Sequence, residues 1–73
     1  MPSIYSSEYQ AFLTRLRQRR LAQGLTQVQV ARVLRKPQSF VSKIETGERR
    51  LDPLELKALA KLYGVRIDRL LDA

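Results

Sequence analysis

Apolar residues recur along this chain at intervals of three and four positions, and no stretch alternates between apolar and polar residues with period two. This spacing predicts amphipathic helices and an all-α fold without strands. A first helix is expected from Ser6 or Ser7, either of which can cap it, to about Ala22. Its inner face carries Phe12, Leu13 and Leu16.

Two further helices are expected after Gly47. Asp52, Pro53 and Glu55 combine a cap, a proline at the first helical position and an acidic residue at the third, which is typical of a helix start. The apolar surface of this helix is so wide that we expect it to be the most buried one; it comprises Leu54, Leu56, Leu59, Ala60 and Leu62. A short last helix, about residues 66–72, carries Ile67, Leu70 and Leu71.

The segment from Gly24 to Gly47 predicts two short helices joined by a tight turn. Thr26 is a good N-cap, and Gln29 three residues later can complete a capping box. Pro37 disfavours helix at the preceding residue and suits the first turn of a new helix. The expected buried positions are Val30, Ala31 and Leu34 in the first helix, and Val41 and Ile44 in the second. The whole chain is therefore predicted to fold as a compact five-helix domain.

The second helix of this segment has an unusual exposed face. It turns Gln38, Ser39, Ser42 and Lys43 outward, and these side chains have donors and acceptors that reach base edges in a DNA major groove. Two short helices with such a face form a helix-turn-helix pattern.

Length and composition exclude several classes of protein. A chain of 73 residues allows one domain, 1–73, of which we take 1–6 as an N-terminal arm. It contains no cysteine and no histidine, so we expect no disulfide, no metal site, no cofactor and no enzymatic activity. No apolar run approaches a membrane span and no secretory leader is evident, which favours a cytoplasmic protein.

The net charge of +7 is unevenly distributed. Between Arg15 and Arg50 there are ten basic residues against two acidic ones, whereas from Leu51 to the end there are four of each. A basic excess by itself could serve only solubility. Its concentration around a helix-turn-helix favours binding to nucleic acid.

These residues resemble the lambda-repressor-like, or Cro/XRE-type, helix-turn-helix family of bacterial and phage regulators. The resemblance covers about residues 12–72, and the spacing from Gln27 to Glu45-x-Gly47 is its most specific part. The matching positions are Arg20, Gly24-Leu25-Thr26-Gln27, Ala31, Ser42, Ile44-Glu45-Thr46-Gly47, Leu59-Ala60 and Tyr63-Gly64-Val65.

The resemblance implies a role for each polar position. Base-reading residues would be Gln38, Ser39 and Lys43, and Gln27 would bond a phosphate and support the reading helix. Further phosphate contacts are expected at Arg35, Lys36, Ser42, Thr46, Arg49 and Arg50. Arg20 and Glu45 would form a structural ion pair between the first and third helices, with a phosphate contact as the alternative for Arg20.

Two positions depart from the family pattern. Arg35 stands where the turn usually has glycine. Either the backbone there has a positive φ, which would strain an arginine by roughly 1–2 kcal/mol, or the turn closes differently, with Pro37 fixing the following helix. Phe40 is expected either to be partly buried against the second helix or the Leu51 loop, or to make an apolar contact with DNA.

The expected function is that of a transcriptional regulator that binds double-stranded DNA. One short helix reads only a few base pairs, so we expect a homodimer on an inverted-repeat operator, without a small-molecule effector. The expected dimer face is the last helix, with Ile67, Leu70 and Leu71. The alternative is the aromatic N-terminal arm, with Ile4, Tyr5, Tyr9 and Phe12. A competing hypothesis is an antitoxin-like module whose main partner is a protein, although no tail beyond Ala73 is present to wrap one.

Overall fold

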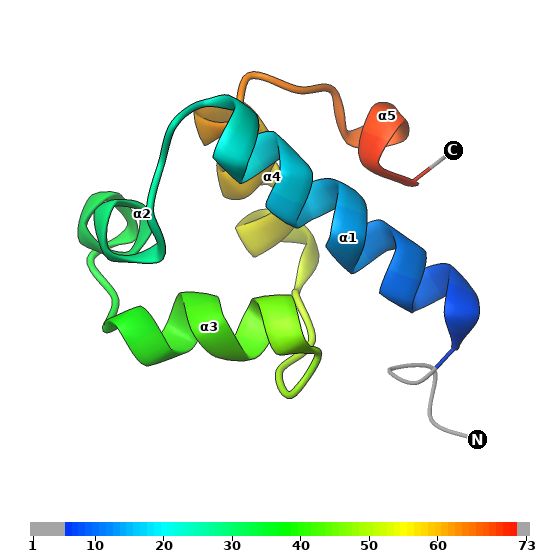
Figure 1. Cartoon of the computed structure of the whole chain (residues 1–73), viewed down its shortest axis with the longest axis horizontal. Coiled ribbons are helices and arrows are strands. Elements are labelled where there is room, and N and C mark those ends of the chain that lie inside the picture. Colours follow the sequence, from blue (N-terminus) through cyan, green and yellow to red (C-terminus); the bar gives the residue numbers. More distant parts are fainter. Residues whose placement is uncertain (1–5, 72–73) are drawn as a thin grey trace.

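The computed structural model describes residues 6–71, which form five helices and contain no strand. The helices are α1 (Ser7–Ala22), α2 (Gln27–Leu34), α3 (Gln38–Thr46), α4 (Pro53–Leu62) and α5 (Ile67–Leu71) (Figure 1). The predicted all-α class and the five helices are confirmed. Most of the N-terminal arm, including Ile4 and Tyr5 of the alternative dimer face, lies outside the described residues.

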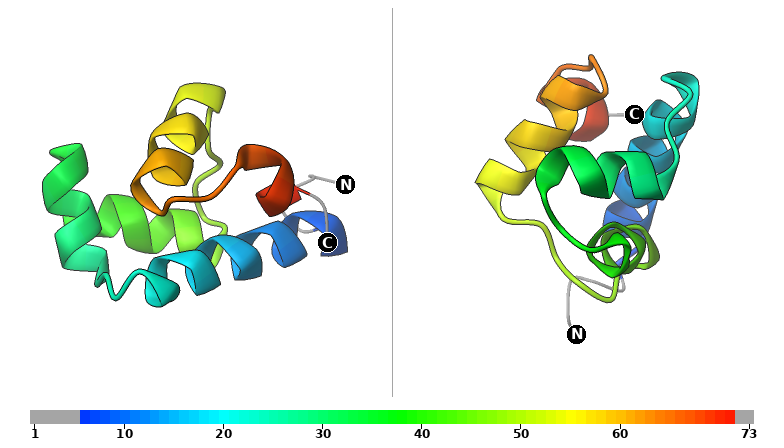
Figure 2. Two further views of the ribbon diagram at one scale, coloured as in Figure 1. Left: turned by 90° about the horizontal axis from the view of Figure 1, so that it is seen from above. Right: turned by 90° about the vertical axis from the view of Figure 1, so that its left-hand side faces the viewer.

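The helices pack as a small cluster in which α3 contacts both α1 and α2, and α5 contacts α1 and α4 (Figure 1, Figure 2). The radius of gyration is 11.4 Å. α2 and α3 lie side by side and are connected by a short turn, and the loop after α3 leaves from the opposite end of that helix (Figure 1).

The helix starts follow the sequence signals. Ser6 caps α1, because its Oγ accepts the N–H of Tyr9 at 3.1 Å. The predicted capping boxes of Thr26 with Gln29 and of Asp52 with Glu55 are both present. Pro37 differs from the expectation: it precedes α3 as its N-cap residue, with extended backbone and no side-chain cap.

Three helix ends share one backbone motif. After α1, α2 and α4, a residue with positive φ lets two successive N–H groups bond back to the last turn, as in a Schellman motif. Gly24 and Gly64 occupy this position after α1 and α4, and Arg35 occupies it after α2, with φ 58° and ψ 44°. The glycine position therefore does require a left-handed backbone here, and an arginine adopts it.

Buried apolar side chains from all five helices form one hydrophobic core. It comprises Phe12, Leu13, Leu16, Val30, Ala31, Val41, Ile44, Leu59, Ala60, Tyr63 and Leu70. Two expectations are corrected by it. Leu70 has no exposed surface, so it belongs to the core of its own protomer and is not available to the expected dimer face. Leu54 of α4 is 75% exposed, and only Leu59 and Ala60 of this helix are buried, so α4 is not the most buried helix.

An arginine holds the last helix in place. Arg15 of α1 donates from Nε to the carbonyl oxygen of Leu70 at 2.7 Å and from Nη2 to that of Leu71 at 3.1 Å. The carbonyls at a helix C-terminus lack partners within the helix, so a cation suits this position. This contact spans 55 residues of sequence, and no local pattern could have predicted it.

Candidate nucleic-acid interface

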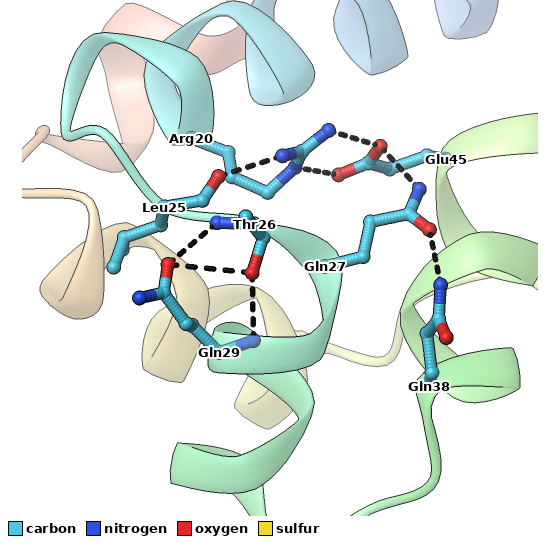
Figure 3. A network of polar contacts seen from close by, with 7 residues as sticks. All are labelled: Arg20, Leu25, Thr26, Gln27, Gln29, Gln38 and Glu45. Carbon is cyan, nitrogen blue, oxygen red and sulfur yellow. Dashed lines mark hydrogen bonds and ion pairs between the residues drawn. The ribbon is translucent and has the colours of Figure 1, made fainter.

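A network of four side chains connects α1 to the first turn of α3 (Figure 3). Arg20 donates to Glu45 from Nε at 2.7 Å and from Nη2 at 3.1 Å. Glu45 Oε1 also accepts Nε2 of Gln27 at 3.0 Å, and Gln27 Oε1 accepts Nε2 of Gln38 at 3.4 Å. The network therefore runs from a buried ion pair to an exposed amide at the start of α3.

The ion pair at the origin of this network is buried. The side chains of Arg20 and Glu45 are 7% and 6% exposed, and Arg20 also donates from Nη1 to the carbonyl oxygen of Leu25 at 2.7 Å. The expected structural pair is thus present, and its burial leaves Arg20 no path to a phosphate. Since burial costs offset much of the attraction, the pair orients α3 against α1 more than it adds stability.

The polar face of α3 is present as expected at the first residues. Gln38, Ser39 and Lys43 are exposed, whereas Ser42 is half-buried. Ser39, Lys43 and Thr46 follow one another at i, i+4 and i+7, which aligns them along one side of the helix. Gln38 is set apart from them by its bond to Gln27, which holds its amide beside the start of α2.

Basic side chains flank both ends of α3. Arg35 and Lys36 are exposed in the turn before it, and Arg49 and Arg50 follow it in the loop. At the end of the helix, Thr46 Oγ1 lies 3.2 Å from the carbonyl oxygen of Lys43 and equally far from Oε1 of Glu48, so its one proton can go to either.

Arg49 is engaged inside the protein. It donates from Nη1 and Nη2 to the two carboxylate oxygens of Glu55, at 2.7 and 2.8 Å, and from Nη1 to the carbonyl oxygen of Arg50 at 3.0 Å. The hydrogen bond from Arg49 lowers the pKa of Glu55, which keeps this carboxylate ionised. Arg49, expected to contact a phosphate, therefore already holds a carboxylate with both of its terminal nitrogens.

Phe40 is half-buried against the core, in agreement with the first of its two readings. Its ring lies beneath two cations, with the Lys36 ammonium 5.4 Å and the Arg49 guanidinium 4.6 Å from the ring centroid. It also lines a groove of about 210 Å³ together with Leu34, Leu54 and Ala58. Phe40 thus supports the cations on either side of α3.

Within residues 6–71 no group of acidic side chains could hold a metal ion. The same residues contain no helix long and apolar enough to cross a membrane.

Comparison with known proteins identifies the family. The model of the helix-turn-helix family matches residues 16–70, which is more than half of the chain. The chain therefore belongs to the helix-turn-helix family of the Cro/C1/XRE type, as its sequence resemblance implied. Its fold is consistent with that of the lambda repressor, and it is a DNA-binding domain of the kind found in transcription regulators. Neither the curated proteins nor the solved structures give a match.

Sequence reasoning missed several contacts at this interface, among them the Gln38–Gln27 hydrogen bond and the two that follow. The Gln27–Glu45 hydrogen bond and the Arg49–Glu55 pair each join elements whose mutual position is set only by packing. The signal for the second was present but ambiguous, because Glu55 was fully explained as a member of the Asp52 capping box. The structure shows that its Oε1 performs both tasks.

Proposed function

We propose that this protein is a sequence-specific regulator of transcription that places α3 in the major groove of double-stranded DNA. The observation that carries this proposal is the network ending on Gln38. A buried ion pair holds Gln27, and Gln27 accepts the amide of Gln38 at 3.4 Å, which favours one orientation of that amide at the exposed start of α3. A side chain that is already oriented in the free protein suits sequence readout, because it loses less conformational entropy on binding.

The chemistry left on Gln38 matches adenine. One of its two N–H groups is donated to Gln27, which leaves the second N–H and the carbonyl oxygen free. Adenine presents N7 as an acceptor and N6 as a donor in the major groove, so both remaining groups can bond the same base. Lys43, one turn further along, can donate to guanine O6 and N7, and Ser39 can bond either base type.

Backbone contacts would come from residues around this reading face. We assign them to Gln27, Arg35, Lys36, Ser42, Thr46 and Arg50. The three cations lie in the turn before α3 and the loop after it, so they would grip phosphates on both sides of the groove. Such contacts orient the protein but carry no sequence information.

We further propose that the protein is cytoplasmic and binds an inverted repeat as a homodimer. A few base pairs, each contributing about 1–3 kcal/mol, cannot single out one site in a genome, whereas two half-sites can. With Leu70 buried, the exposed Leu71 becomes the main apolar residue of the α5 face. It borders a groove of about 470 Å³, whose other apolar lining residues are Tyr9, Phe12, Leu51 and Leu56.

Selection of bound sequences from a random duplex library tests the proposal. We expect a palindromic site to be enriched, which would support base reading and dimeric binding together. Failure to enrich any sequence would contradict it and favour the antitoxin-like alternative.

Gln38→Ala tests the reading residue at the selected site. We expect it to lose about 1–3 kcal/mol of binding free energy there while its affinity for random duplex stays nearly unchanged. Equal losses on both DNAs would contradict base reading by Gln38. Gln29→Ala is a suitable control, because this glutamine also lies in a first helical turn but bonds only within its own capping box.

A further inference from the structure

The loop after α3 contains a cation that is already neutralised. The guanidinium of Arg49 forms a bidentate pair with Glu55, stacks 4.6 Å from the centroid of the Phe40 ring, and donates to the carbonyl oxygen of Arg50. An exposed ion pair is commonly weak because its side chains are free to move. Here the two parallel hydrogen bonds and the ring hold the guanidinium in one place.

The carboxylate is held as firmly as the cation. Oε1 of Glu55 accepts the backbone N–H of Asp52 at 3.1 Å, which closes the capping box of α4. The side chains of Arg49 and Glu55 are 40% and 20% exposed, respectively. The acceptor is thus anchored to the start of a helix, and Arg49 is the partner that would have to move away.

The position of the pair gives it a consequence for binding. Arg49 lies in the basic loop next to Arg50, and Lys36 contacts the same Phe40 ring. A phosphate that approached Arg49 would have to displace Glu55 and would then face this carboxylate at close range. Like charges at such a distance repel, so both effects oppose a phosphate contact.

We propose that Glu55 withholds Arg49 from the DNA backbone and thereby lowers the sequence-independent part of this protein's affinity for DNA. This inference rests on the proposed function, and it makes Glu55 a residue that sets how strongly the domain holds any duplex. Phosphate contacts supply essentially all of non-specific binding, so one withheld cation reduces the affinity for random DNA directly.

Glu55→Gln is the informative substitution. The glutamine oxygen can still accept the Asp52 N–H, so the capping box remains, but the charge that holds Arg49 is gone. Releasing one cation to the backbone should steepen the dependence of log affinity on log salt by about 0.9, an affinity gain of about eightfold for each tenfold reduction in salt. The measurement is fluorescence anisotropy with a random-sequence duplex over a salt series.

Asp68→Asn is the matched control. It makes the same change in net charge and frees Arg66 from its pair with Asp68, but on α5, which does not contact α3 (Figure 1). Its slope should stay close to that of the parent protein. An equal steepening in both variants would overturn the proposal, since net charge alone would then explain the gain.

Two arginine variants complete the test. Arg49→Gln in the parent protein should leave the salt slope unchanged, and adding Arg49→Gln to Glu55→Gln should abolish the gain. A slope reduced by about one in the single Arg49 variant would overturn the proposal, because Arg49 would then already contact a phosphate. Arg49→Gln alone alters the loop after α3, so its result does not depend on how well Glu55→Gln folds.

The parent protein separates this inference from the function on which it rests. If it does not bind duplex DNA at all, the proposed function fails before any variant is compared. If it binds and Glu55→Gln, folded by circular dichroism, has the parent slope, only the role of Glu55 is refuted.

Discussion

Replacing Arg35 with glycine should stabilise this protein, although the change removes a long side chain and adds none. Arg35 has φ 58° and ψ 44°, a left-handed backbone that strains an L-residue with a Cβ by about 1–2 kcal/mol. Glycine removes this strain but makes the unfolded chain more flexible, which costs about 0.4–1 kcal/mol. The net gain is about 0.8 kcal/mol, within a range of about 0–1.6 kcal/mol.

The hydrogen bonds of this turn should survive the change. The N–H groups of Arg35 and Lys36 bond the carbonyl oxygens of Arg32 and Ala31, and glycine adopts the same backbone readily. The Arg35 side chain has no hydrogen bond or ion pair to the other described residues, so no contact is lost with it.

Thermal unfolding followed by circular dichroism measures the effect. For a domain of this size, about 1 kcal/mol raises Tm by about 4–8 °C, so we expect a rise of about 3–6 °C. Arg35→Ala is the control, because it removes the same charge and keeps the strain. Equal stability of the glycine and alanine variants would refute strain at this position.

Gly24 offers the reverse experiment. It occupies the same position in the motif after α1, with φ 71°, and a Cβ there would meet no atom within 4 Å. Gly24→Ala therefore introduces strain without a steric clash, and it should destabilise the protein by about the amount that Arg35→Gly gains.

On DNA, Arg35→Gly should flatten the dependence of log affinity on log salt by about 0.9 if Arg35 contacts a phosphate. The strained arginine would then serve binding at the expense of stability.

Three further changes test the core, the titration of a buried tyrosine and the dimer face. Arg20→Met should lower the free energy of unfolding in urea by about 3–5 kcal/mol, because it leaves Glu45 buried without its partner. The double variant Arg20→Met, Glu45→Leu should recover most of this loss, and a double variant as unstable as the single one would contradict the role of the pair. Burial raises the pKa of Tyr63 to about 12, so the unfolded chain, with its tyrosine pKa near 10, ionises first as the pH rises. The free energy of unfolding should therefore fall by about 2–3 kcal/mol between these pH values, and in Tyr63→Phe this fall should be absent. Leu71→Asp should convert a dimer to a monomer in analytical ultracentrifugation while Leu54→Asp, another exposed leucine, should not; a dimer that persists in Leu71→Asp would move the interface elsewhere.

Much of the architecture could be predicted because its signals are local. A capping box needs only two residues three positions apart, and both predicted boxes are present, at Thr26 and at Asp52. The buried positions of α2 and α3 follow from helical spacing, and Val30, Ala31, Val41 and Ile44 lie in the core as expected. Such features depend on the backbone near each residue and hardly on the rest of the fold.

The same local reasoning failed where an element's environment decided the outcome. Leu70 and Leu71 are adjacent leucines of one short helix, yet the first is fully buried and the second 51% exposed. Helical spacing shows that they point in different directions, but not which one meets α1 and α4. That depends on how α5 is docked, and Arg15 holds it there from the other end of the chain.

By itself, then, the sequence determined the five helices and the polar face of α3, because each follows from interactions within a few residues. It left open how the turn closes, and the structure shows the left-handed backbone at Arg35. Tertiary structure alone decided how the polar side chains are shared. It placed Gln27 between Glu45 and Gln38, and it paired Arg49 with Glu55. The reason is physical: a charged side chain pairs with whatever lies within hydrogen-bonding reach, and packing alone brings distant parts of a chain within that reach.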